Sequence, residues 1–184
     1  DGYKNLYVIS LIDGKKICTN KGQNDRAPYR GISLYKFEKV VYAVFIRQNY
    51  LQLVNIENCK SHKLKKEIIV KDVVSPILIH NSKAIILPNG TNPLAYDLTN
   101  GELLWKVSIE PEQKKLLKKY NLGNKFHWDV WGGGTLDLKY NQVIFSTANA
   151  KPSFVSKGRE GPNLFYNSVV SINLENGKYN WHFQ

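Results

Sequence analysis

A repeated strand–turn–strand pattern is the feature of this sequence that most restricts its fold. In each copy, alternating apolar residues run into a turn, and a second short strand follows. The copies cover residues 7–18, 51–64, 95–105 and 170–181. The last two have Asn-Gly at the turn and end on Trp105 and Trp181, whereas the first has Asp-Gly and ends on Cys18, and the second has Asn58-Cys59. Because Asn-Gly readily adopts the positive φ angles of a tight hairpin, the pattern predicts a series of β-hairpins.

The spacing of these turns predicts a β-propeller. Turn positions 14, 59 and 101 follow one another at about 40–45 residues, the length of a four-stranded blade. The interval from 101 to 177 fits one blade with roughly 30 inserted residues, which we assign to residues 108–126 and 151–167. A Trp that ends each unit can wedge between radially packed sheets. We therefore expect an all-β fold of about three to four blades, each with four antiparallel strands, in one partial propeller domain over residues 1–184; a β-sandwich with unrelated Asn-Gly hairpins is the alternative.

Further strands are expected between the turns. Residues 39–46, 67–70, 76–79, 84–87 and 142–147 are rich in β-branched or aromatic side chains and are bounded by turn residues. The chain also contains 11 Tyr and 4 Trp but no Met. This composition favours β-structure over a helix bundle.

The formal net charge of +11 would suit an anionic partner. However, the lysines are scattered, and we interpret the one dense run, residues 112–120, as a solvated loop or short surface helix. No nucleic-acid partner is expected, and a basic nucleic-acid-binding β-domain is the third-ranked interpretation. Cys18 and Cys59 are too few for a zinc site, but one disulfide between them is open in an oxidising compartment. There is no membrane-length apolar run, signal peptide or initiating Met, as expected for a mature protein or an excised piece.

The common catalytic signatures, such as HExxH, GxSxG and the P-loop, are absent. The stretch 127–152 nevertheless combines two Trp residues, the glycine run 132–134, and Asn149 at a strand end. Trp131 and Asn149 are about one hairpin apart, so we expect both at the same end of a blade. An aromatic floor beside a neutral oxygen donor can hold a planar cofactor and a hard cation such as Ca²⁺. An ordinary blade with a core Trp and a turn Asn is the alternative.

Three segments carry a family resemblance: "DVWGGGTLDLKYNQVIFSTANAKP" (129–152), "GPNLFYNSVVSINLENGKYNWHFQ" (161–184) and "YRGISLYK" (29–36). Together they resemble the quinoprotein dehydrogenases, eight-bladed propellers that use pyrroloquinoline quinone (PQQ). The resemblance implies that Arg30 contacts the quinone, that Trp131 stacks under its ring plane, and that Asn149 is an amide ligand of the metal. It implies PQQ and Ca²⁺, or another divalent or lanthanide ion, as cofactors.

The resemblance also implies an activity. Such an enzyme oxidises an alcohol or a sugar by hydride transfer to the quinone and passes electrons to a cytochrome or a membrane quinone. The implied location is the periplasm, with membrane association left open. We expect residues 1–184 to be about the first third to half of such an enzyme. We assign no catalytic residue, because the resemblance places the catalytic Asp in a segment that follows "WHFQ".

Three departures from the family pattern leave another function open. Asn24-Asp25 stand where some members have adjacent cysteines, and "TAN" replaces "TGN" at residues 147–149. The segment "NGTNPLAYD" (89–97) has no acid before Asp97, although the alcohol-oxidising branch has a Glu metal ligand there. The alternative is therefore a non-catalytic propeller that serves as a scaffold for protein–protein contacts.

Overall fold

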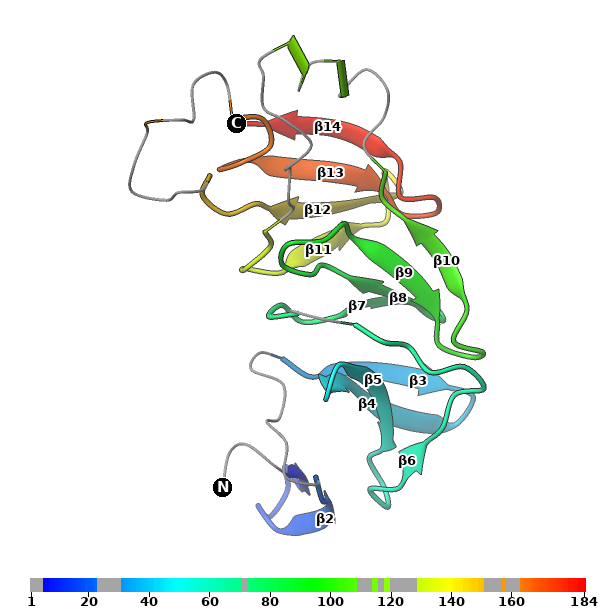
Figure 1. Ribbon diagram of the computed structural model, residues 1–184. Coiled ribbons are helices and arrows are strands. Elements are labelled where there is room, and N and C mark those ends of the chain that lie inside the picture. Colours follow the sequence, from blue (N-terminus) through cyan, green and yellow to red (C-terminus); the bar gives the residue numbers. More distant parts are fainter. Residues whose placement is uncertain are drawn as a thin grey trace.

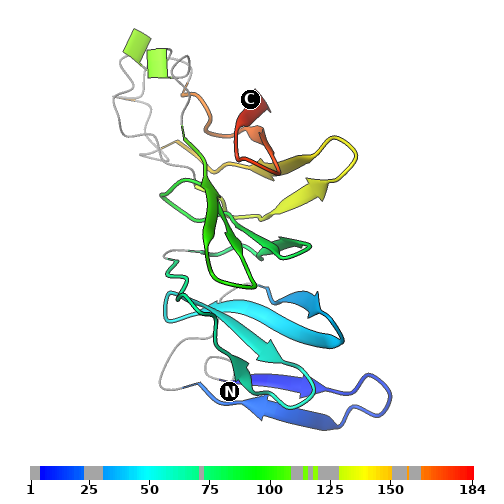
Figure 2. The same ribbon diagram turned by 90° about the vertical axis from the view of Figure 1, so that its right-hand side faces the viewer.

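The structure is a computed structural model that describes residues 5–22, 31–70, 73–108, 114–115, 118–119, 129–150, 157 and 163–184. These residues form four antiparallel sheets that follow one another in chain order along an arc (Figures 1 and 2). In every sheet, each strand pairs with the strand next to it in the sequence. This arrangement confirms the expected all-β fold of four-stranded antiparallel blades.

The first sheet is a hairpin, and the other three each have four strands. The hairpin contains β1 (Leu6–Ile9) and β2 (Lys16–Asn20). The next sheet, blade 1, contains β3 (Ser33–Phe37), β4 (Val40–Arg47), β5 (Tyr50–Asn55) and β6 (Ser61–His62). Blade 2 contains β7 (Leu78–His80), β8 (Lys83–Ile86), β9 (Leu94–Asp97) and β10 (Leu103–Lys106). Blade 3 contains β11 (Gly134–Asp137), β12 (Gln142–Ser146), β13 (Val169–Asn173) and β14 (Tyr179–Phe183).

The first strands of the blades converge. Strand β7 contacts both β3 and β11, which places the first strand of each blade nearest the centre of the arc. The chain passes from β2 to β3 as it passes from β6 to β7 and from β10 to β11. By this order, β1 and β2 occupy the third and fourth strand positions of a blade.

The same turn joins the third and fourth strands throughout. Its key residue has a positive φ angle in all four copies: Gly14 (69°), Cys59 (58°), Gly101 (78°) and Gly177 (68°). In each copy the backbone N–H of this residue donates to the carbonyl oxygen four residues earlier, at 2.8–3.0 Å. The side chain of the preceding Asp or Asn accepts the N–H two residues further along the chain. The repeat predicted from the sequence is therefore confirmed in its turns.

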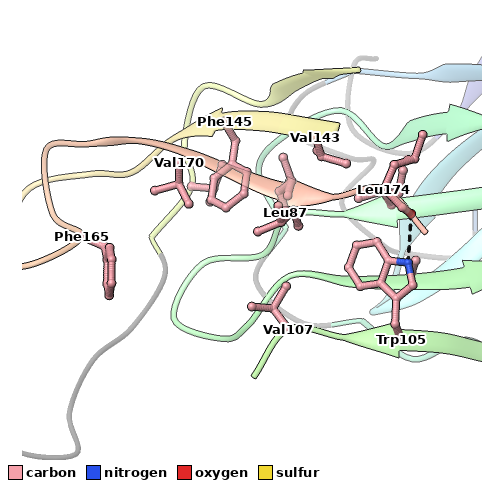
Figure 3. Close-up of a cluster of buried hydrophobic side chains, with 12 residues drawn as sticks. Leu87, Trp105, Val107, Val143, Phe145, Phe165, Val170 and Leu174 are labelled. Carbon is pink, nitrogen blue, oxygen red and sulfur yellow. Dashed lines mark hydrogen bonds between the residues drawn. The ribbon is translucent and has the colours of Figure 1, made fainter. Parts of the chain in front are cut away.

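The hydrophobic core lies between neighbouring sheets. One cluster, between blades 2 and 3, includes Leu87, Trp105, Phe145 and Val170 (Figure 3). A second cluster fills the space between blades 1 and 2, and a third, which includes Phe45, lies between the hairpin and blade 1. The interior is thus a row of interfaces between sheets, as in a propeller.

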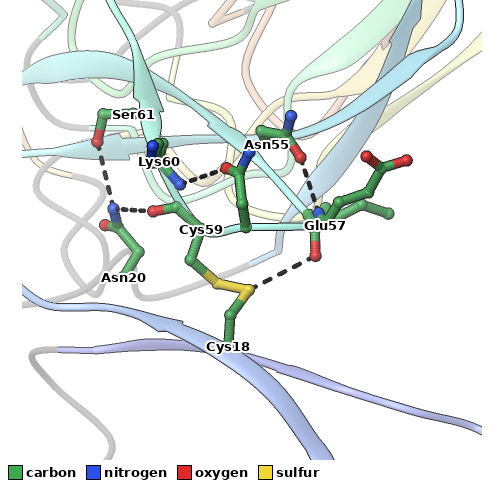
Figure 4. Close-up of a disulfide and its surroundings, with 9 residues drawn as sticks. Cys18, Asn20, Asn55, Glu57, Cys59, Lys60 and Ser61 are labelled. Carbon is green, nitrogen blue, oxygen red and sulfur yellow. Dashed lines mark hydrogen bonds between the residues drawn. A yellow bond between two sulfur atoms is a disulfide. The ribbon is translucent and has the colours of Figure 1, made fainter.

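The turn residue of each blade lies close to the preceding sheet or to the linker that follows it. A Cβ at Gly177 would lie 2.5 Å from Cε3 of Trp105, and a Cβ at Gly101 would meet the backbone carbonyl of Lys66. At the equivalent place in blade 1, Cys59 forms a disulfide with Cys18 of the hairpin (Figure 4). Trp105 and Cys18 hold the same position in their repeats, four residues after the turn residue. The disulfide therefore occupies the place of a Trp-on-Gly contact, and it settles the pairing that the sequence left open.

The expectation of a strand at residues 67–70 is wrong. This segment makes one isolated bridge, between Tyr50 and Ile69, and two backbone hydrogen bonds with the residues around the β4–β5 turn. Its apolar side chains alternate: Ile68 and Val70 are buried, whereas Ile69 is exposed. The alternation reflects burial against blade 1 rather than membership of a sheet.

Most of the two predicted inserts, 108–126 and 151–167, lies outside the described residues. Within the lysine-rich run, residues 114–115 and 118–119 are helical and exposed, as expected for a surface helix. The end of the second insert returns to the core, where Phe165 is buried against blade 3. In the described part of the chain, there is no helix of the length and apolarity needed to cross a membrane.

A pH effect on stability is expected from His182 in β14. Phe165 packs edge-on against its ring at 4.8 Å, and Nδ1 lies 2.6 Å from the Tyr179 hydroxyl. Burial lowers the pKa of the imidazole below its ordinary value of 6.5. Below about pH 6.5 the unfolded chain therefore binds more protons at this group than the folded protein does, and the free energy of unfolding falls as the pH is lowered through the folded pKa.

Thermal melting between pH 7.5 and pH 5 should check this expectation. We expect His182→Gln to reduce the loss of melting temperature at acid pH. Equal pH profiles for the wild type and His182→Gln would contradict the assignment.

Candidate cofactor site

The starts of the three central strands meet at one end of the blades. A Cβ at Gly31, before β3, would lie 2.6 Å from Cγ of Pro76, and a Cβ at Gly133, before β11, would lie 3.4 Å from Cδ of the same proline. The Ser33 hydroxyl donates to the carbonyl oxygen of Ile77. Pro76, which precedes β7, therefore brings the approaches to β3 and β11 together. We use the term Trp131 end for this end of the blades.

The structure places two of the three predicted site residues at the Trp131 end. Trp131 precedes β11, and Asn149 follows its partner β12, so the hairpin returns Asn149 to the level of Trp131. The N–H of Ala148 donates to the carbonyl oxygen of Asp129 at 2.7 Å, which joins the two segments directly. Arg30 lies outside the described residues, but its neighbour Gly31 touches Pro76 at this same end.

Both placed residues are accessible. The Trp131 side chain is 51% exposed, in contrast to the 7% of Trp105 in the core. Asn149 is also exposed. The alternative of a core Trp at position 131 is therefore wrong, because this indole presents a large part of its surface outside the core.

The three glycines at 132–134 differ in their surroundings. Gly133 and Gly134 pack closely within the protein: Gly133 has a φ of 83°, and a Cβ at Gly134 would lie 2.8 Å from Leu87 Cδ1. Gly132, by contrast, is exposed, and the atom nearest to a Cβ added there would be Ser146 Oγ at 3.6 Å. Of the three glycines only Gly132, next to Trp131, is exposed, so a ligand could approach the backbone there.

Two polar residues at this end were missed by the sequence analysis. Asp129 is the one acidic residue with a buried side chain among the described residues, at 2% exposure, and its Oδ1 accepts the N–H of Gly90 at 2.9 Å. Asn89, which precedes Gly90, has a buried side-chain oxygen. Asp129 lies two residues before Trp131 in a motif already singled out, so its spacing from Trp131 was a usable signal. The segment that begins with Asn89 had been noted for its missing acid, but Asn89 itself had not been considered as a site residue.

The side chains at the Trp131 end include amide oxygens, which are the type of ligand that a hard cation prefers. Asn149 and Asn89 offer amide oxygens, and no described residue donates a hydrogen bond to the Asn89 Oδ1 atom. Within the described ranges, however, no three His, Cys, Asp or Glu side chains gather closely enough to hold a metal ion. Among the described residues, the amide oxygens of Asn149 and Asn89 are therefore the candidate ligands for a cation at this end.

The fold defines the class of protein: a partial β-propeller built of four-stranded antiparallel blades. A family profile described as "PQQ: Glucose/ethanol/alcohol dehydrogenase, beta-propeller domain" matches residues 54–184. The chain therefore belongs to this family of PQQ propellers, as the sequence resemblance implied.

Individual relatives agree with this assignment. The chain is 30% identical over 108 residues to a quinohemoprotein alcohol dehydrogenase of Comamonas testosteroni, a match over 49% of this chain and 15% of that protein. The solved structure of the quinohemoprotein alcohol dehydrogenase from Comamonas testosteroni superposes with a TM-score of 0.76 at 21% identity, over 100% of this chain and 32% of the other. A europium-containing methanol dehydrogenase superposes with a TM-score of 0.67 at 15% identity, over 98% of this chain and 38% of the other. The chain thus spans well under half of the length of these proteins.

Proposed function

We propose that this chain is part of a PQQ-dependent dehydrogenase that oxidises an alcohol or a sugar. The observation that carries the proposal is the placement of Trp131 and Asn149 at one end of a PQQ-family propeller, beside the start of β3, which Arg30 precedes. Relatives whose names describe quinone-dependent alcohol dehydrogenases support the reaction class. The electron acceptor is proposed to be a cytochrome or a membrane quinone.

Each of the three proposed site residues has a distinct role. The exposed indole of Trp131 provides a flat apolar surface under a planar cofactor. Arg30 pairs with carboxylates of the cofactor, because a guanidinium binds a carboxylate through two parallel hydrogen bonds. Asn149 supplies an amide oxygen to the cation, and Gly132, which is exposed and has no side chain, lets the cofactor approach the backbone. The bound quinone supplies the hydride-accepting chemistry.

The cation is proposed to be Ca²⁺ or a lanthanide. Oxygen donors from amides suit both, because both are hard cations with flexible coordination. The similarity to a europium-containing methanol dehydrogenase supports a lanthanide as one of the two.

A periplasmic location is also proposed. The Cys18–Cys59 disulfide supports it, because disulfides form and persist in oxidising compartments such as the periplasm. Alkylation of free thiols in protein taken directly from cells tests this point. The disulfide should leave both cysteines unmodified until a reductant is added, and a full yield of alkylated Cys18 and Cys59 without reductant would contradict the proposal.

Cofactor binding by the full-length protein tests the proposed function. Calorimetric titration with PQQ in the presence of Ca²⁺ should give saturable binding. Trp131→Ala should weaken this binding by roughly two- to tenfold, because stacking on an aromatic ring contributes ~0.5–1.5 kcal/mol. The matched control is Trp181→Ala, which removes another partly exposed indole from β14 and should leave the affinity unchanged. After reconstitution, the wild-type protein should oxidise an alcohol or a sugar with an artificial electron acceptor.

One observation favours a second function. The loop 89–93 contains no acidic residue, so the Glu that the family resemblance implies as a metal ligand is missing. If the full-length wild type neither binds PQQ nor oxidises any alcohol or sugar, a non-catalytic propeller that contacts other proteins replaces the dehydrogenase proposal.

A further inference from the structure

The missing acidic ligand raises the question of which group of this chain could take its place. Asn89 lies in the loop between β8 and β9, the loop in which the acid was expected. Its Oδ1 atom is buried, and it accepts no hydrogen bond from any described residue. Buried polar atoms normally have a partner, because an unsatisfied acceptor loses its hydration without compensation. An unpartnered amide oxygen beside a candidate cation site is therefore a candidate ligand.

Asp129 ties this loop to the rest of the site. Its Oδ1 accepts the N–H of Gly90 at 2.9 Å, and its own carbonyl oxygen accepts the N–H of Ala148 at 2.7 Å. Gly90 and Ala148 are the immediate neighbours of Asn89 and Asn149. A single buried residue thus holds the segments that carry the two amide side chains, and Trp131 follows it by two positions.

We propose that Asn89 supplies an oxygen ligand in place of the absent acid, and that Asp129 is the residue that positions it next to Asn149. The ligand is a hard cation, Ca²⁺ or a trivalent lanthanide. This inference rests on the proposed function, since the cation is the one that accompanies the quinone. Because both amides are neutral, we expect the cation to bind more weakly to the protein alone than in the presence of the anionic cofactor.

Terbium luminescence in the full-length protein tests the inference without any activity measurement. Excited Trp131 sensitises Tb³⁺ bound nearby, so the emission reports occupancy directly. We expect Asn89→Ala to weaken Tb³⁺ binding by about tenfold or more, and Asp129→Asn, which alters the residue that positions the ligand, to weaken it by about 10–100-fold. Asn180→Ala, on β14, is the matched control and should bind Tb³⁺ as the wild type does.

Asn89→Asp is the second variant. The inference predicts that it gains Tb³⁺ affinity, and a folding defect would not produce such a gain. A carboxylate at this position should strengthen Tb³⁺ binding and reduce its dependence on added PQQ. If the wild type binds PQQ and Tb³⁺ but neither Asn89 variant changes the Tb³⁺ affinity, the inference is wrong and the proposed function stands. If the wild type binds neither ligand, both are wrong.

Discussion

Replacement of Cys18 by serine should lower the free energy of unfolding by about 4 kcal/mol, the loop-entropy value for a disulfide between residues 41 positions apart. The disulfide is the covalent link between the first hairpin and blade 1. The hairpin and blade 1 are also joined by the cluster around Leu6 and Phe45. Asn20 adds hydrogen bonds from its Nδ2 to the Cys59 carbonyl oxygen and to Ser61 Oγ (Figure 4), and its Oδ1 accepts one from Arg47 Nη1. Loss of the disulfide should therefore loosen the hairpin before the blades.

Cys59 offers a sharper version of the same experiment. Its φ of 58° is a left-handed conformation that Gly adopts without strain at the equivalent positions 14, 101 and 177. Cys59→Gly also removes the disulfide, but it relieves about 1–2 kcal/mol of backbone strain. We therefore expect Cys59→Gly to be less destabilising than Cys18→Ser by about 1 kcal/mol, as measured by urea unfolding under oxidising conditions.

A paired substitution tests whether the disulfide replaces a packing contact. Cys18→Trp combined with Cys59→Gly would recreate the relation of Trp105 to Gly177 between the hairpin and blade 1. This double variant should be more stable than Cys18→Ser combined with Cys59→Gly, and a reductant should not change its stability. Equal stability of the two double variants would show that a Trp at position 18 does not pack on residue 59 as Trp105 packs on Gly177.

Replacement of Trp105 by alanine should destabilise the protein by about 3–5 kcal/mol. The indole is 7% exposed, packs between blades 2 and 3, and donates from Nε1 to the Leu174 carbonyl oxygen at 3.2 Å (Figure 3). Its removal leaves a cavity and also takes one of two donors from the Leu174 carbonyl oxygen, which then keeps only the hydrogen bond from Lys83 Nζ. Urea unfolding should show the loss as a lower midpoint.

Gly177 provides the partner for a double-mutant cycle with Trp105. In the wild type, Gly177→Ala combines a positive φ with a Cβ that would lie 2.5 Å from the indole. The matched control is Gly14→Ala, because Gly14 has nearly the same φ but no atom near the added Cβ. We expect Gly14→Ala to be destabilising by about 1 kcal/mol, and Gly177→Ala to be clearly worse only while Trp105 is present. A Gly177→Ala effect that is the same with and without Trp105 would contradict the contact.

Some features follow from short-range sequence alone. The turns could be predicted because Asp-Gly and Asn-Gly adopt a positive φ by local sterics, so their spacing reveals the repeat without knowledge of distant contacts. The return of Asn149 to the level of Trp131 could be predicted for a similar reason, because hairpin length sets which end of a blade a residue reaches. Residues 67–70 show the limit of such local evidence, since β-branched side chains report burial as readily as pairing.

Other features depend on how distant segments meet. Trp105 and Trp181 hold the same position in their repeats, yet their side chains are 7% and 41% exposed. The difference arises because blade 3 packs on Trp105, whereas no described sheet packs on the side of blade 3 that faces away from blade 2. For the same reason, the sequence could not decide whether Cys18 and Cys59 pair, because that requires the hairpin and blade 1 to be placed side by side.

The candidate site likewise has features that follow from local sequence and features that depend on tertiary packing. The sequence by itself determined the propeller repeat, the family resemblance and the choice of Arg30, Trp131 and Asn149, because local turn sterics and contiguous motifs carry them. Only the tertiary structure brought Asn89 and Gly90 of blade 2 against Asp129 of blade 3, across 39 residues of sequence. A hydrogen bond between blades depends on how two sheets pack, and no local propensity encodes that packing.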